Sequence, residues 1–273
     1  MLNFDPARFL RIQTGTVSIA RDLGTLVGRL VAEGADSLFF MGSGGAGILM
    51  QPATDLMRRA SNLPCHNVLC AEIVLTGHVA LGSKSVVIMP SLSGTTKESI
   101  AAMDYVKARG ATVISITGHA ETPLAKGADH SFVNFAEDDT SCEMFYVTSL
   151  VAALAAMQAR GERSDYDRII AELAGLPQQL LAVKQAFEPR ADALARAIAA
   201  DGWHILTGSG AAWPEAYYYG MCILEEMQWI RTRPVHASDF FHGTLELVEK
   251  GVSVVVFAGE DETRPLTDRV IAF

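Results

Sequence analysis

The sequence predicts an α/β fold made of two units, each with a doubly wound parallel sheet that helices cover on both faces. Three apolar runs carry the prediction, "SLFFMG", "SVVIMP" and "ATVISITG", and helical segments separate them. Unbroken apolar runs are typical of strands buried on both faces, which occur in parallel sheets with right-handed crossovers. The 273 residues are 49% hydrophobic, which is enough apolar surface for a sizeable core.

The first half alternates helix and strand signals. Apolar positions three and four residues apart predict helices, and short apolar runs followed by glycine or polar residues predict strands. The predicted helices cover residues 9–32, 48–60, 96–110 and 142–160. The predicted strands cover residues 37–42, 66–74, 85–90, 111–118 and 130–137.

The second half repeats the pattern of the first. "WHILTGSGAA" matches "LFFMGSGGAG", with 166 residues from Gly42 to Gly208, which indicates an internal duplication. The polar stretch 161–180 is interpreted as the link, so the expected units are 1–162 and 163–273. The second unit is expected to be an incomplete copy, because it has fewer strand signals. Its expected helices and strands cover residues to about 200, then 203–208, 216–229, 233–243, 252–259 and 263–273.

Composition excludes several classes of partner. The formal net charge is −9 and the basic residues form no run, so a nucleic-acid partner is not expected. No apolar run reaches the roughly 18 residues that a membrane span needs. The N-terminus lacks the layout of a signal peptide, and a cytoplasmic protein is the expectation.

Cysteine and histidine spacing gives no sign of a metal. Cys65, Cys70, Cys142 and Cys222 match no zinc or CxxC pattern, so they are expected to be reduced thiols. The sequence predicts neither a metal nor another cofactor.

A run of hydroxyls follows the strand "SVVIMP" and leads directly into a helix. Ser91, Ser93, Thr95 and Thr96 surround Gly94, which permits a turn that a Cβ would hinder. Hydroxyls and the free N–H groups of a helix N-terminus can together hold a phosphate. The alternative is helix capping by one hydroxyl, with Glu98 near the N3 position, but capping accounts for only one or two of the four hydroxyls.

The glycine-rich stretch "GSGGAG", residues 42–47, is a weaker signal. It has neither the lysine of a P-loop nor the glycine spacing of a dinucleotide site. A tight strand-to-helix turn and a ligand contact through Ser43, Gly44 and Gly45 both remain open.

The hydroxyl run resembles the signature of the SIS (sugar isomerase) domain, which binds a sugar phosphate through a Ser-x-Ser-Gly-x-Thr pattern. Ser91, Ser93, Gly94 and Thr96 match it. The resemblance implies two flavodoxin-like SIS subdomains and a phosphosugar ligand. The family's Gly-Cys-Gly-x-Ser turn has Ala46 in place of its serine, so one hydroxyl is missing and Ser43 is the candidate substitute.

The second half resembles the catalytic segment of the same family. Glu226 and His242 are 16 residues apart, as the family's catalytic pair is, and Asp239 occupies the position of the loop acid. The resemblance implies that Glu226 is a general base and that His242 opens the sugar ring. Glu226 is expected to be buried because its helix is apolar, and the alternative is a solvated helix carboxylate. The alternative for His242 is a loop histidine packed beneath Phe240 and Phe241. His236 is the alternative imidazole, and Thr148 and Asp239 are further candidate substrate contacts.

Among SIS proteins, the chain looks most like the fructosamine (ketosamine) 6-phosphate deglycases. It has neither a glutaminase domain nor a DNA-binding helix-turn-helix in the given sequence. The alternatives are a phosphosugar aldose–ketose isomerase, an aminosugar-phosphate deaminase and, from another class, a non-catalytic sugar-phosphate-binding regulator. The resemblance also implies a homodimer or higher homo-oligomer with the site at the subunit interface.

Overall fold

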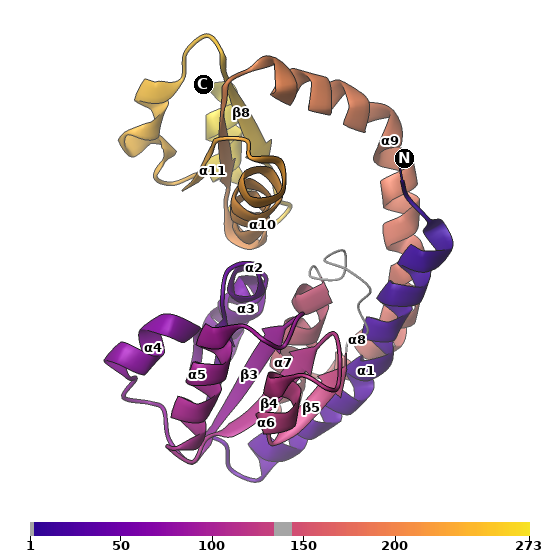
Figure 1. Cartoon of the computed structure of the whole chain (residues 1–273), viewed down its shortest axis with the longest axis vertical. Helices are drawn as coiled ribbons and strands as arrows, with labels where there is room; N and C mark the ends of the chain where they lie inside the picture. The colour runs from indigo at the N-terminus through magenta and orange to yellow at the C-terminus, as the bar shows by residue number, and fades with distance from the viewer. Residues whose placement is uncertain (1–2, 134–143) are drawn as a thin grey trace. The chain divides into compact units, whose positions relative to one another are not determined.

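The computed structural model describes residues 3–133 and 144–273 (Figure 1). The chain forms two compact units, unit 1 (Met1–Ala182) and unit 2 (Val183–Phe273). Their boundary lies inside helix α9 (Leu176–Ala200), whereas the sequence placed it at residues 162 and 163. The polar stretch interpreted as the link contains helix α8 (Tyr166–Glu172) and the start of α9.

Unit 1 contains a five-stranded parallel sheet, which confirms the predicted fold class. The strand order β2-β1-β3-β4-β5 is the flavodoxin-like order, with the first strand inside the sheet. The strands are β1 (Ser37–Gly42), β2 (Cys65–Leu69), β3 (Ser85–Ser91), β4 (Thr112–Thr117) and β5 (His130–Val133). The helices are α1 (Pro6–Ala32), α2 (Gly45–Ile48), α3 (Gln51–Ala60), α4 (Cys70–Thr76), α5 (Lys97–Lys107), α6 (Pro123–Gly127) and α7 (Met144–Ala159).

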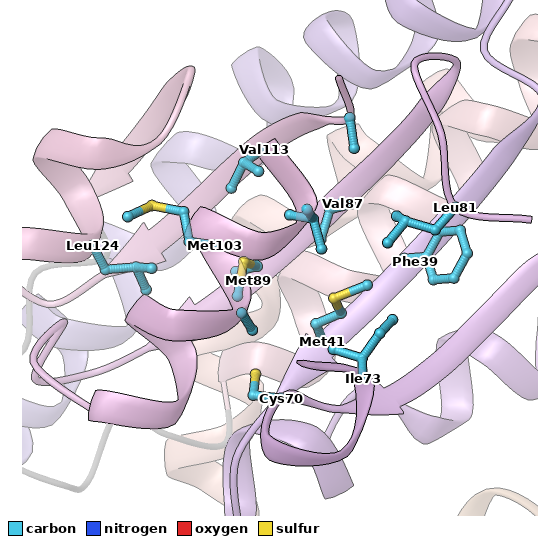
Figure 2. Close-up of a cluster of buried hydrophobic side chains, with 13 residues drawn as sticks. Phe39, Met41, Cys70, Ile73, Leu81, Val87, Met89, Met103, Val113 and Leu124 are labelled. Carbon is cyan, nitrogen blue, oxygen red and sulfur yellow. The ribbon is translucent and has the colours of Figure 1, made fainter. Parts of the chain in front are cut away.

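Helices cover both faces of this sheet, α1 and α7 on one side and α4, α5 and α6 on the other (Figure 1). Every residue of β1 and β3 is buried. Alternate strand residues such as Phe39, Val87 and Met89 pack with helix residues such as Ile73 and Met103 (Figure 2). The apolar runs are continuous because each of these strands needs apolar side chains on both of its faces.

One predicted strand is wrong in its second half. The sequence predicted a strand over residues 66–74, but β2 ends at Leu69 and α4 begins at Cys70. Cys70 and Ile73 are three residues apart, so both point to the same side of a helix, and both are buried against the sheet. The apolar residues after Leu69 therefore form the buried face of a helix.

Unit 2 contains a three-stranded parallel sheet in the order β7-β6-β8. Its first strand is central, with the next two on either side, as in β2-β1-β3 of unit 1. The strands are β6 (Trp203–Gly208), β7 (Thr232–His236) and β8 (Val252–Phe257). The helices that follow β6 and β8 are α10 (Trp213–Tyr218), continued by the π-helix η4 (Tyr219–Met227), and α11 (Arg264–Ala272).

The same glycine ends the central strand of each unit. A Cβ on Gly42 would lie 2.5 Å from the backbone nitrogen of Gly47, and one on Gly208 would lie 2.8 Å from the backbone oxygen of Ala212. The backbone returns so closely over each strand end that only glycine fits. The equivalent strand order and the equivalent glycine support a duplicated unit.

Candidate functional site

The hydroxyl loop, residues 91–96, leaves the carboxyl end of β3, where ligands bind in open parallel sheets. Ser91 is buried, Ser93 and Thr95 are exposed, and Thr96 is half-buried. Gly94 has φ +60°, and a Cβ there would lie 2.2 Å from the hydroxyl oxygen of Thr122. Gly94 is therefore required both by the turn and by its packing against Thr122.

Hydrogen bonds hold this loop in a tight curve. The backbone N–H of Gly94 donates to Ser91 Oγ at 3.2 Å, and that of Thr95 donates to Ser93 Oγ at 3.3 Å. Ser91 Oγ and Thr96 Oγ1 lie 3.3 Å apart. The structure thus brings the predicted hydroxyls of one loop together.

Helix capping does not account for these hydroxyls. Thr96 is the N-cap of α5, and its side chain caps no N–H of that helix. The N3 position belongs to Ser99, so Glu98 lies one residue too early for the capping box that the sequence suggested. The first turn of α5 therefore keeps N–H groups that can serve an anion.

The glycine-rich turn follows β1, the neighbour of β3 in the sheet. Gly44 has φ +55°, and a Cβ placed on it would have no heavy atom of the described residues within 4 Å. Gly45 begins α2, and Ala46, where the family has a serine, is half-buried. Gly44 thus borders open space beside the hydroxyl loop's strand.

Ser43 has a partner that the sequence analysis missed. Its side chain and that of Ser99 lie beside the thiol of Cys70, a buried residue at the start of α4, and both act to lower the pKa of that thiol. Burial is the main reason why the pKa of Cys70 is raised. Cys70 thereby connects the turn after β1 to α5. A single sequence gives no signal for this contact, since it joins three separate segments.

Glu226 lies in the π-helix η4 and is exposed, which corrects the expectation of a buried carboxylate. Its neighbour Glu225 points elsewhere, because its carboxylate accepts a hydrogen bond of 2.6 Å from the hydroxyl of Thr232. Thr232 begins β7, so this acidic pair lies near the amino end of that strand. The apolar positions of η4 pack inward at Gly220 and Leu224, and Glu226 is not among them.

His242 follows the carboxyl end of β7, in a 3-10 turn (Phe240–His242), and is exposed. Its backbone N–H donates to the carbonyl of Asp239 at 2.9 Å. Within the described chain, His242 and Glu226 share no hydrogen bond. Both side chains are therefore accessible, and unit 2 does not pair them.

A short polar network lies beside His242. Ser238 Oγ lies 2.7 Å from His236 Nδ1 and 3.4 Å from Asp239 Oδ1. The backbone N–H of Ser238 also donates to His236 Nδ1 at 3.2 Å, which leaves the proton on Nε2. His236 is thus the more firmly oriented of the two imidazoles.

Thr148 is buried in α7, and its hydroxyl donates to backbone carbonyls of its own helix, at 3.4 Å for Met144 and 3.3 Å for Phe145. Cys142 lies outside the described residues. Cys65, Cys70 and Cys222 form no disulfide among the described residues, in line with the predicted reduced thiols.

Across residues 3–133 and 144–273, no three His, Cys, Asp or Glu side chains gather as a metal site would require. In the same residues, every helix is too short or too polar to cross a bilayer.

Two deglycases are similar to most of the chain. "Fructosamine deglycase FrlB" of Bacillus subtilis strain 168 is 29% identical over 263 residues, which are 94% of this chain and 79% of the relative. "Fructoselysine 6-phosphate deglycase" of Escherichia coli strain K12 is 26% identical, over 91% of this chain and 72% of the relative.

Two solved structures are similar to this chain in residues of both units. A crystal structure of a Bacillus subtilis protein described as a phosphosugar isomerase is 28% identical, with a TM-score of 0.85, and covers 95% of this chain and 80% of its own. The C-terminal domain of glucosamine-fructose-6-phosphate aminotransferase from Francisella tularensis has the same fold, with 17% identity, a TM-score of 0.84 and coverage of 98% and 78%. The model of the SIS domain matches residues 33–161, the segment with the hydroxyl loop. These residues match an SIS domain.

Proposed function

We propose that this protein is a ketosamine 6-phosphate deglycase, an enzyme that cleaves a phosphorylated Amadori compound to an aldose 6-phosphate and an amine or amino acid. The observation that carries the proposal is the match to two named deglycases over more than nine-tenths of the chain. The exposed Glu226 and His242 and the clustered hydroxyls of residues 91–96 support it.

The hydroxyl loop anchors the substrate's phosphate in this proposal. Ser91, Ser93, Thr95 and Thr96 donate to its oxygens, together with N–H groups at the start of α5. Ser43, Gly44 and Gly45 bound the same space from β1. The loop performs no chemistry and fixes one end of the sugar, so that the other end meets the acid–base groups.

Glu226 acts as the general base. Once the sugar ring is open, the C2 ketone acidifies the C1 proton, and a positioned carboxylate removes it. The C1–H electron pair becomes the C1=C2 bond of an enaminol, and the C2 oxygen takes up a proton. The enaminol then tautomerises without any change of oxidation state: C2 gains a proton, the nitrogen gives up its own proton, and the C1–N bond becomes the C=N bond of an imine. Water adds to the imine and releases the amine, leaving the aldose.

His242 opens the ring and shuttles protons, because a neutral imidazole has one nitrogen that donates a proton and one that accepts a proton. Asp239 supports that loop, and His236 is the alternative imidazole. Thr148 has the weakest case among the candidate substrate contacts, since it is buried and bonded within its own helix.

A homo-oligomer completes the site. Glu226 and His242 are exposed and unpaired with each other in one chain, which supports a site where one subunit supplies His242 to substrate held by another. We place the protein in the cytoplasm, where phosphorylated sugars are metabolised.

A second candidate, a phosphosugar aldose–ketose isomerase, is favoured by the structural relative described as a phosphosugar isomerase. It uses the same first proton transfer and stops before hydrolysis.

A substrate panel separates these functions. The full chain is incubated with fructosamine 6-phosphates of several amino acids and, in parallel, with fructose 6-phosphate. The deglycase releases glucose 6-phosphate and free amino acid in equal amounts. Turnover of fructose 6-phosphate without cleavage of any ketosamine would refute the deglycase and favour the isomerase.

A further inference from the structure

The loop that follows β8 in unit 2 corresponds, position by position, to the hydroxyl loop of unit 1. Ser85 and Val252 hold the same place in the two sheets, each paired with the first residue of the central strand. The N-cap threonine of the next helix follows 11 residues later in both units, Thr96 in one and Thr263 in the other. Residues 258–263, Ala-Gly-Glu-Asp-Glu-Thr, therefore replace Ser-Leu-Ser-Gly-Thr-Thr.

The turn after the central strand contains a glycine of similar, positive φ in both units. Gly44 has φ +55° and Gly210 has φ +53°. The space beside Gly44 is open among the described residues, whereas a Cβ on Gly210 would lie 2.2 Å from a carboxylate oxygen of Asp261. The place that is open in unit 1 thus contains a carboxylate in unit 2.

Asp261 receives the hydrogen bonds that an anion would receive there. Its Oδ2 accepts from the backbone N–H of Ala211 at 2.9 Å, and its Oδ1 accepts from the backbone N–H of Thr263 at 2.8 Å. The hydroxyl of Thr263 lies 2.5 Å from Oδ1. Backbone N–H groups and a hydroxyl, with no basic side chain among these donors, are also the groups that unit 1 offers.

We propose that Asp261 is a built-in anion that occupies, in unit 2, the place that the substrate's phosphate takes in unit 1. Unit 2 is thereby closed to phosphate esters, and each chain binds one of them, in unit 1. Glu260 and Glu262, which replace Ser93 and Thr95, add negative charge that repels a phosphate. The inference rests on the phosphate-binding role proposed for unit 1.

Binding stoichiometry tests the inference without any turnover. Fructose 6-phosphate is titrated into the full chain by calorimetry, and one ligand is expected per chain. Ser93→Ala with Thr96→Ala should weaken that single site roughly 5–150-fold and leave no other. Two ligands per chain would overturn the closure of unit 2 alone. No binding at all would overturn the phosphate site of unit 1, and with it both this inference and the proposed function.

Rewriting the loop gives the sharper test. Glu260→Ser, Asp261→Gly and Glu262→Thr together restore the Ser-Gly-Thr-Thr of unit 1 in unit 2. The stoichiometry should rise from one to two ligands per chain. A rewritten chain that folds, as its circular dichroism shows, and still binds one ligand would contradict the inference.

A single substitution tests the inference if the variant with the rewritten loop does not fold. Asp261→Asn removes the charge and one acceptor, and should lower the melting temperature by about 4–8 °C. Glu260→Gln is the matched control, an exposed neighbour in the same loop, and should leave the melting temperature within about 1 °C. Equal, small effects from both variants would show that Asp261 is not held as a bound anion, and would overturn the inference.

Discussion

Units 1 and 2 share the order of their first three strands and the glycine turn after the central strand, but their loops differ in charge. After β3 the loop presents hydroxyls around Gly94, and after β8 it presents three carboxylates around the same place. Unit 2 in turn carries Glu226 and His242. In the proposed function this difference is a division of labour, in which unit 1 holds the phosphate and unit 2 supplies proton transfer.

The strands that lead into the two loops, β3 and β8, differ in burial as well. All residues of β1 and β3 are buried in unit 1, whereas every residue of β8 is only half-buried. A fully buried strand holds the loop at its end more rigidly, since each side chain packs on a neighbour. A rigid loop suits an anchor, which must fix the substrate before chemistry begins.

The largest expected effect tests the part played by unit 2. Glu226→Gln removes the proposed base, and kcat should fall by about 10²–10⁴-fold while fructose 6-phosphate still binds. Rates with a fructosamine 6-phosphate and calorimetric binding measure the two effects. Glu225→Gln is the control, because its amide oxygen can still accept the hydroxyl of Thr232, and its kcat should be retained. Activity that survives in Glu226→Gln would remove the assignment of the base.

The second-largest expected effect tests the phosphate-binding role proposed for unit 1. Ser93→Ala with Thr96→Ala removes two hydroxyl donors, which costs about 1–3 kcal/mol of phosphate binding, or roughly 5–150-fold in KM. The kcat at saturating substrate should change little, because the loop takes no part in proton transfer. Ser18→Ala, which removes an exposed hydroxyl bonded to Gly15 on α1, should leave KM unchanged. A fall in kcat at constant KM would contradict the division of labour.

Alanine substitutions at two equivalent glycines, Gly44 and Gly210, compare the two turns directly. Gly44→Ala adds a Cβ to open space at positive φ, which costs about 1–2 kcal/mol in backbone strain. Gly210→Ala adds the same strain and also drives the Cβ into Asp261, 2.2 Å from its Oδ2. Thermal unfolding should therefore show a larger loss for Gly210→Ala, by a few degrees. Equal losses would mean that Asp261 is not fixed beside Gly210.

The smallest effect concerns pH and unit 1. Burial, and secondly the charge of nearby His78, lowers the pKa of His66 below its usual 6.5. The two rings lie 4.3 Å apart. Below about pH 6.5 the unfolded chain therefore binds this proton more readily, so folded unit 1 loses stability as the pH falls. Melting temperatures measured between pH 8 and 5 should decline less steeply in His66→Gln, whereas His119→Gln, an exposed control, should keep the wild-type slope.

The parallel sheet of unit 1 could be predicted because its strands are apolar on both faces. This pattern is visible in each strand without knowing which strands pair with it. Helix α4 could not be predicted, because the short and mostly apolar run "LCAEIV" is compatible with a strand as well as with a helix. Only its contact with the sheet selects the helix, which places Cys70 and Ile73 on one buried face. Glu226 was likewise expected on a buried face, but the π-helix leaves it exposed.

By itself the sequence determined the fold class, the strand that ends in the hydroxyls of residues 91–96, and the repeat of the glycine turn at Gly208. These features depend on local pattern, on residue type and on spacing along the chain. Only the tertiary structure decided that Ser43 meets Cys70 and that Asp261 fills the turn at Gly210. Asp261 and Ala211 are 50 residues apart, and only the pairing of β6 with β8 brings them together.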